Sequence, residues 1–148
     1  MKVILASDHA GLELRQDLVA LLKERGVAFE DLGPHTRESV DYPDFASQVS
    51  RAVVADAGTL GVLVCGTGIG MSIVANKHRG VRAALCTTEF EARMTRAHND
   101  ANVLCLGQRV VGVGVARGIL EAFLDTAFAG GRHEQRVQKI RDVEAQQR

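Results

Sequence analysis

The chain has 148 residues, and its 18 lysines and arginines balance 18 aspartates and glutamates, so the formal net charge is zero. This length suits a single domain with a sizeable core. The charge balance argues against nucleic acid or a membrane surface as a partner. The start, "MKVILASDHAG", has too few apolar residues for a signal peptide, and no apolar run is long enough to cross a bilayer. We therefore expect a cytoplasmic protein.

Apolar runs alternate with amphipathic segments along most of the chain. Strands are expected over residues 2–6, 27–33, 61–65, 81–86 and 102–107. Helices are expected over residues 10–26, 41–58, 71–78, 88–99 and 112–128. This alternation predicts a three-layer α/β/α, Rossmann-like domain with a five-stranded parallel sheet. Continuously apolar strands indicate burial on both faces. The pattern leaves the order of the fourth and fifth strands open.

The segment 130–148 is expected to form an extra C-terminal helix of the same single domain, which spans residues 1–148. It follows two glycines and is charged on most faces, with a thin apolar stripe of Val137, Ile140 and Val143. A stripe so narrow predicts that this helix packs against a partner subunit rather than the main core.

The stretch "GVLVCGTGIGMSIVANK", residues 61–77, places Cys65 at the end of a strand. The turn into the next helix consists of Gly66, Thr67, Gly68, Ile69 and Gly70. It is not a dinucleotide fingerprint, because Met71 stands where the next glycine is required. Its free N–H groups suit a phosphate or a developing oxyanion. A helix N-terminus also stabilises a thiolate, so Cys65 could act as nucleophile or base. A tight connection around a buried structural cysteine is the alternative.

The first strand ends in "SDHAG", which places Asp8 and His9 at the same carboxyl edge as Cys65. If strands one and three are neighbours, their turns flank one crevice, where open α/β sheets bind ligands. The alternatives are a helix N-cap for Asp8 and an ordinary surface histidine.

Two pairs of polar residues occur late in the chain. His98 and Asn99 end a helix, a position that favours a protonated histidine even without a function. Arg132 and Arg136 share one face of the tail helix, near its N-terminus, where positive charge is disfavoured. This placement favours a phosphate dianion as a counter-charge, although a solvated face is the alternative.

The other cysteines, Cys86 and Cys105, lie inside apolar runs and are expected to be buried. Three cysteines without a secretory signal suit a reducing compartment. No cysteine or histidine pair has metal-site spacing, so we expect no metal. No cofactor is expected either.

Five segments in order, "SDHAG", "DYPDFA", "CGTGIGMSIVANK", "HNDANVLCLGQRVVG" and "GGRHEQRV", resemble the type B ribose-5-phosphate isomerases. This group includes allose-6-phosphate and galactose-6-phosphate isomerases, and the resemblance covers essentially the whole chain. It implies metal-independent interconversion of ribose 5-phosphate and ribulose 5-phosphate through a cis-enediolate, in the pentose phosphate pathway. It also implies a homodimer, possibly a tetramer, whose site is shared between two chains.

The resemblance further assigns roles to individual residues. Cys65 is the proton-transferring base, since residues 72–77 lack the glutamate that some relatives use. His98 opens the furanose ring. The enediolate oxygen is stabilised by Thr67 and the N–H groups of Gly66, Gly68, Ile69 and Gly70. Sugar hydroxyls are bound by Asp8 and Asn99, and the phosphate by His9, Arg132 and Arg136. Tyr42 and Arg109 lie in matching motifs without a definite role.

Three alternatives remain open at this point. The substrate could be a six-carbon sugar phosphate. A thiol hydrolase could use Cys65, His98 and Asp8 with a covalent intermediate. A non-catalytic sugar-phosphate-binding subunit could have the same fold.

Overall fold

The computed structural model describes residues 1–147. The strands are β1 (Lys2–Ser7), β2 (Ala28–Asp31), β3 (Thr59–Cys65), β4 (Ala83–Leu85) and β5 (Val103–Gly107). The helices are α1 (Leu12–Glu24), α2 (Tyr42–Ala55), α3 (Ile69–Ala75), α4 (Glu89–Asn99), α5 (Val113–Asp125) and α6 (Arg132–Ala145), with a short 3₁₀ turn η1 (His9–Gly11) before α1. Each element lies within or close to its predicted range. Within residues 1–147, no helix combines the length and apolar character needed to cross a membrane.

The strands form one parallel sheet of five, in the order β2-β1-β3-β5-β4. This confirms the predicted fold class. β1 and β3 are neighbours, with Ser7 paired to Val64, so the turns that follow them flank one crevice as expected. The order that the sequence left open is also resolved: β5 lies inside the sheet, and the three-residue β4 forms its edge.

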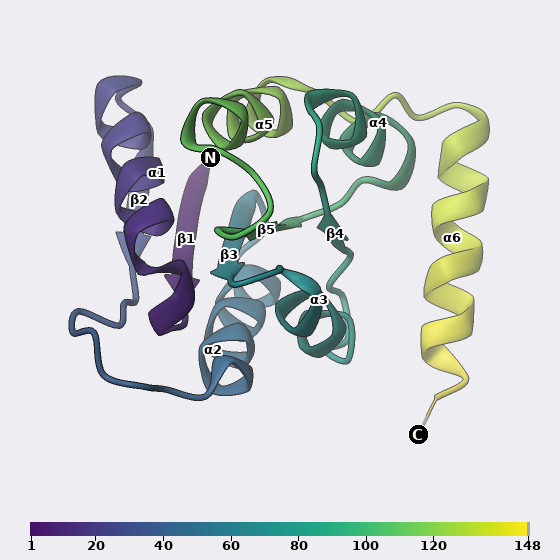
Figure 1. The fold of residues 1–148 in the computed structure, drawn as a ribbon. Helices are drawn as coiled ribbons and strands as arrows, with labels where there is room; N and C mark the ends of the chain where they lie inside the picture. Colours follow the sequence, from purple (N-terminus) through teal and green to yellow (C-terminus); the bar gives the residue numbers. More distant parts are fainter. Residues whose placement is uncertain (148) are drawn as a thin grey trace.

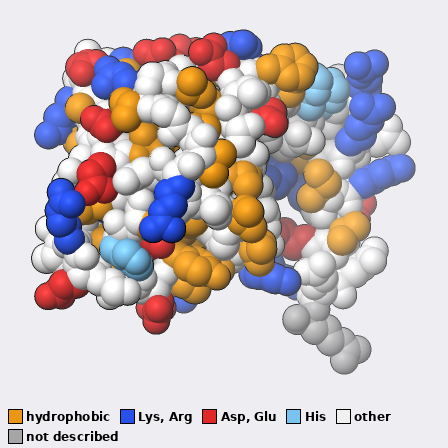
Figure 2. All heavy atoms as spheres, in the orientation of Figure 1, with side chains coloured by type: hydrophobic (Ala, Val, Ile, Leu, Met, Phe, Trp, Pro, Cys, Tyr) orange, Lys and Arg blue, Asp and Glu red, His pale blue; other side chains and the backbone are white. Residues whose placement is uncertain are grey.

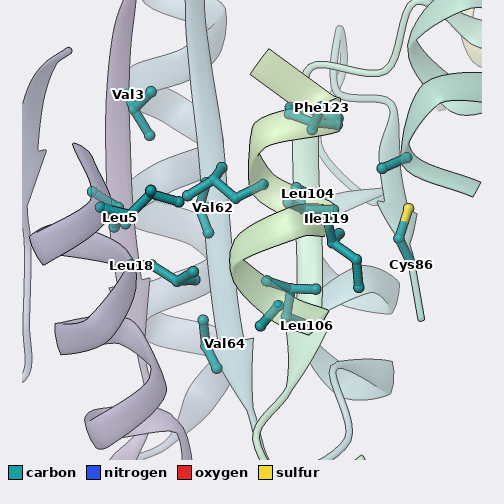
Figure 3. Close-up of a cluster of buried hydrophobic side chains, with 14 of the residues drawn as sticks. Val3, Leu5, Leu18, Val62, Val64, Cys86, Leu104, Leu106, Ile119 and Phe123 are labelled. Atoms are coloured by element: carbon teal, nitrogen blue, oxygen red, sulfur yellow. The ribbon is translucent and has the colours of Figure 1, made fainter. Parts of the chain in front are cut away.

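Helices cover both faces of the sheet (Figure 1). Side chains alternate between two buried clusters, so Val3 and Leu5 face α1 and α5, whereas Ile4 and Ala6 face α2 and α3. Figure 3 shows the first cluster, in which strand residues meet Leu18 of α1 and Phe123 of α5. Burial on both sides explains why the strands are continuously apolar.

Helix α6 lies outside these layers, at the right of Figure 1. Val137 is buried against the chain's own body, whereas Ile140 and Val143 are 45% and 57% exposed. Near its C-terminal end, Glu144 Oε1 accepts the Gly80 N–H at 2.8 Å. The tail therefore docks partly on its own chain, a contact that the sequence did not predict, while two of the three residues of its apolar stripe stay about half exposed.

A groove of about 450 Å³ separates α6 from the body. Ile140 and Val143 line its α6 side, and the ends of α3 and α4 line the other. Figure 2 shows hydrophobic side chains on both sides of this hollow. Beside it, α3 exposes Ile69 and Ile73 by 51% and 55%. We call the groove between α6 and the body the tail groove, and its lining combines apolar residues with charged ones such as Lys77, Arg82 and Glu144.

Candidate active site

Cys65 is the last residue of β3, paired with Gly107 of β5. Its side chain is 6% exposed, and its Sγ accepts the Gly68 N–H at 3.1 Å. Gly68 has a φ of +80°, and a Cβ there would lie 2.5 Å from Leu85 Cδ1. Only glycine therefore fits this position, which is the one that delivers an N–H to the thiol.

Further hydrogen bonds fix the rest of the turn. Thr67 Oγ1 accepts the Ile69 N–H at 3.2 Å. The carbonyl of Cys65 accepts the Gln108 N–H at 2.9 Å, and the carbonyl of Gly66 accepts the Arg109 N–H at 3.0 Å. The start of the β5–α5 connection thus anchors the first two residues of this segment by their carbonyl groups.

Tyr42 and Arg109, whose roles the sequence left open, flank this turn. A Cβ on Gly70 would lie 2.7 Å from the Tyr42 ring, so the ring lies directly against the backbone. A Cβ on Gly66 would lie 3.5 Å from Arg109 Nη1. The structure therefore places an aromatic ring against one end of the glycine turn and a guanidinium against the other.

Asp8 and His9 lie in the neighbouring turn, as predicted. Asp8 is 7% exposed and caps η1, since its Oδ1 accepts the N–H groups of Ala10 and Gly11 at 2.9 and 3.1 Å. The N-cap interpretation of Asp8 is thus correct as far as Oδ1 is concerned. His9 is exposed, and its Nδ1 accepts the Val40 N–H at 3.2 Å.

His98 and Asn99 end α4, and the His98 ring stacks on that of His133 in α6, with centroids 4.1 Å apart. His133 is buried, and burial lowers its pKa, with His98 and the arginines Arg132 and Arg136 adding to the effect. A neutral His133 can stack on His98 without charge repulsion. His133 was not predicted from the sequence, although it lies four residues before Val137 and therefore on the same face of α6 as the apolar stripe.

The two groups of residues lie at opposite ends of the strands, one at the carboxyl ends and the other at the amino ends. Cys65 pairs with Gly107, the last residue of β5. Asn99, in contrast, lies near the start of β5 and β4, where its carbonyl accepts the Nε–H of Arg82 at 3.0 Å. The five residues of β5 span about 13 Å. One chain therefore brings Asp8, His9 and Cys65 together, and separately His98, Asn99, Arg132 and Arg136, but does not join the two groups.

The other two cysteines are buried, as predicted. Burial raises the pKa of the Cys86 thiol to about 12, with Glu91 adding to the effect. Burial also raises the pKa of Cys105 well above its usual range. Neither thiol ionises near neutral pH, so neither is suited to proton transfer.

Comparison with known proteins shows which proteins this chain is similar to in sequence and fold. A family model described as Ribose/Galactose Isomerase matches residues 3–140. Ribose-5-phosphate isomerase B of Escherichia coli (strain K12) is 46% identical over 143 residues, covering 97% of this chain and 96% of that protein. The structure of Clostridium thermocellum ribose-5-phosphate isomerase B matches with a TM-score of 0.95 at 49% identity over 98% of each chain. The Mycoplasma genitalium enzyme with bound ribulose-5-phosphate also gives a TM-score of 0.95, at 41% identity over 99% of this chain and 97% of that one.

A parallel α/β sheet with a cysteine–glycine turn at its switch point, matched over nearly the whole chain, defines an aldose–ketose isomerase of sugar phosphates. The chain belongs to the ribose/galactose isomerase family, and its resemblance to the type B ribose-5-phosphate isomerases is confirmed.

Proposed function

We propose that the enzyme interconverts ribose 5-phosphate and ribulose 5-phosphate in the pentose phosphate pathway, with Cys65 as the base. The observation that carries this proposal is the hydrogen bond from the Gly68 N–H to Cys65 Sγ at the switch point of the sheet. A donor aimed at sulfur stabilises the thiolate, the form that accepts a proton. The Mycoplasma genitalium relative, solved with ribulose-5-phosphate, supports the five-carbon substrate.

The chemistry needs a proton to move from C2 of the open-chain aldose to C1 of the ketose. Cys65 takes the C2 proton. The electrons of that C–H bond form the C1–C2 double bond while the π electrons of the C1 carbonyl move onto O1, which gives a cis-enediolate. The proton of the C2 hydroxyl passes to O1, the electrons on O2 then form the C2 carbonyl, and the thiol returns its proton to C1. The Thr67 hydroxyl and the N–H groups of the turn stabilise the negative oxygen as it develops, except those of Gly68 and Ile69, which already donate to Cys65 Sγ and Thr67 Oγ1. No step requires a metal or a cofactor.

The remaining residues bind the substrate and open its ring. His98 moves the proton between the ring oxygen and the anomeric hydroxyl, because isomerisation requires the open chain. Asp8, through the Oδ2 that capping does not use, and Asn99 bind sugar hydroxyls. His9, Arg132 and Arg136 bind the phosphate, whose remote binding energy positions the reacting carbons.

This assignment requires two chains, because one chain holds the two groups at opposite ends of its strands. We propose a homodimer in which α3 of one chain packs into the tail groove of its partner. Ile69 and Ile73 would then meet Ile140 and Val143, four side chains that a single chain leaves about half exposed. Burying the exposed half of each contributes about 1 kcal/mol. In a two-fold interface the contact occurs twice, so two complete sites form.

A thiol hydrolase is disfavoured, because the family of this chain is described as Ribose/Galactose Isomerase. The non-catalytic alternative is disfavoured because both proton-transfer residues are present. A six-carbon substrate is the second candidate, since the family name includes galactose as well as ribose.

The test is a side-by-side assay of ribose 5-phosphate, allose 6-phosphate and galactose 6-phosphate, with and without a strong chelator. We expect kcat/KM to be highest for ribose 5-phosphate and unchanged by chelation. A higher value for either six-carbon substrate would reassign the enzyme within its family. Activity lost on chelation and restored by a divalent ion would contradict the metal-free mechanism.

The phosphate assignment predicts the effect of Arg136→Ala. A hydrogen bond to a charged group contributes about 1.5–3 kcal/mol, so kcat/KM for ribose 5-phosphate should fall about tenfold to a hundredfold. The slow reaction of unphosphorylated ribose should hardly change. Arg141→Ala, an exposed arginine further along α6, is the matched control and should leave both rates intact. Equal losses on both sugars would show that Arg136 supports the fold instead.

A further inference from the structure

Arg15 of α1 is the bulkiest of the fully buried side chains in residues 1–147, with 1% exposure. Its Nη1 donates to Ser7 Oγ at 2.6 Å, and its Nη2 donates to the Pro34 carbonyl at 2.7 Å. Its Nε lies 3.0 Å from Asp31 Oδ1, an ion pair without hydrogen-bond geometry. One guanidinium thus joins the end of β1, the end of β2 and the start of the loop that follows β2.

Stability alone does not explain this residue. Burial lowers the pKa of Arg15, opposed by the nearby Asp31 carboxylate, so the charge is held in an unfavourable environment. Well-packed apolar side chains often replace a buried ion pair with no loss of stability or with a gain. Arg15 also lies on the apolar face of α1, three residues before Leu18, where a leucine would pack. A buried, hydrogen-bonded polar side chain at this position indicates that it fixes the geometry of the segments it contacts.

The segment that Arg15 fixes is the loop of residues 32–41, through the Pro34 carbonyl. This loop contains no helix or strand and runs from β2 to α2, along the carboxyl edge of the sheet. Near its end the Val40 N–H donates to His9 Nδ1 at 3.2 Å. The residue after the loop is Tyr42, whose ring lies against Gly70 of the catalytic turn. Its start and end are thus fixed at two places, at Arg15 and at the candidate site.

We propose that Arg15 is a positioning residue that seats the 32–41 loop so that Val40 holds His9 as the Nε2–H tautomer. A neutral imidazole has one donor and one acceptor nitrogen. While Nδ1 accepts the Val40 N–H, the ring proton must be on Nε2. The ring then offers that N–H, in a fixed orientation, to the substrate phosphate. This last consequence rests on the proposed function, whereas the tautomer does not.

The first test is nuclear magnetic resonance of the His9 ring in the substrate-free protein, because ¹⁵N shifts distinguish the two tautomers. In the unmodified protein we expect the Nε2–H tautomer alone. Arg15→Met keeps the length of the side chain but removes both hydrogen bonds, and it should show a measurable Nδ1–H fraction. Arg15→Lys retains the charge and should restore the tautomer at least in part.

The second test is kinetic. Arg15→Met should weaken competitive inhibition by inorganic phosphate about tenfold, the effect of losing one oriented hydrogen bond to a charged group. The KM for ribose 5-phosphate should rise similarly, while kcat changes little. A residue that only stabilised the fold would not separate KM from kcat in this way.

Leu18→Ala is the matched control, since it damages the core on the same helix, where Leu18 is fully buried. It should lower Tm at least as much as Arg15→Met, yet leave the tautomer and phosphate inhibition unchanged. The proposal fails if Arg15→Met keeps the pure tautomer, or if Leu18→Ala reproduces its changes. If Arg15→Met does not fold, Val40→Pro removes the donor directly, and an unchanged tautomer in that variant would overturn the proposal. Failure of the proposed function would instead appear as no turnover of ribose 5-phosphate by the unmodified enzyme, whatever the tautomer.

Discussion

Cys65→Ala should lower kcat on ribose 5-phosphate by at least about 10²-fold, the lower end of what a general base contributes. The side chain is small and its Sγ accepts one hydrogen bond, from the Gly68 N–H, so its loss removes the proton acceptor without dismantling the turn. The affinity for a competitive inhibitor such as inorganic phosphate should therefore stay nearly constant. Steady-state kinetics and an inhibition series on the same preparation give both values.

Cys86→Ala is the control for this substitution, because that thiol is also buried but its pKa is raised to about 12. It should retain normal turnover. Alkylation of the unmodified enzyme should modify Cys65 first and abolish activity, and a bound substrate analogue should slow the reaction. Near-normal turnover in Cys65→Ala would remove the cysteine from the mechanism.

Mixing two inactive variants, Cys65→Ala and His98→Ala, should restore about a quarter of normal activity once subunits exchange. The reason is the proposed shared site: one chain holds the two groups at opposite ends of its strands, so each site of the proposed dimer would take its cysteine from one chain and its histidine from the other. In a mixed dimer one site then carries both lesions and the other carries none. With random pairing, about half of the dimers are mixed, each with one good site of two.

A second mixture controls for effects of exchange itself. His98→Ala and Arg136→Ala alter the same half of the proposed site, so every site in their mixed dimer carries one lesion. This mixture should show no more than the mean activity of its parents. Exchange confirmed by mass spectrometry, together with no recovery in the first mixture, would show that each chain builds its own site.

The local features of this chain were predictable from its sequence because they depend on near neighbours. Apolar periodicity located every strand, and the burial of both sheet faces followed from continuous apolar runs. The glycine spacing placed Cys65 at a strand-to-helix turn, and α/β topology placed Asp8 and His9 beside it. Side-chain spacing within a segment determines such features.

Contacts between distant segments were not predictable in the same way. The position of β5 between β3 and β4 depends on packing that no single segment encodes. The stacking of His98 on His133 joins residues 35 positions apart, so it depends on how α6 docks. Arg15 was missed because an arginine in a helix normally indicates an exposed position. Its place three residues before Leu18 was the available signal.

The glycines around Cys65 restrict how this family can evolve. Gly68 needs its left-handed backbone and has no room for a Cβ, Gly70 is blocked by the Tyr42 ring, and Gly107 lies against the Thr67 backbone. Substitutions at these three glycines are therefore disfavoured, and a change of sugar specificity must come from substitutions elsewhere. The 32–41 loop and α6 lie outside the sheet, so they can change without disturbing the turn, provided that the Arg15 and His9 contacts of the loop and the arginines of α6 are kept. Exchanging them between relatives is therefore the expected route by which this scaffold acquires a longer sugar while its chemistry stays the same.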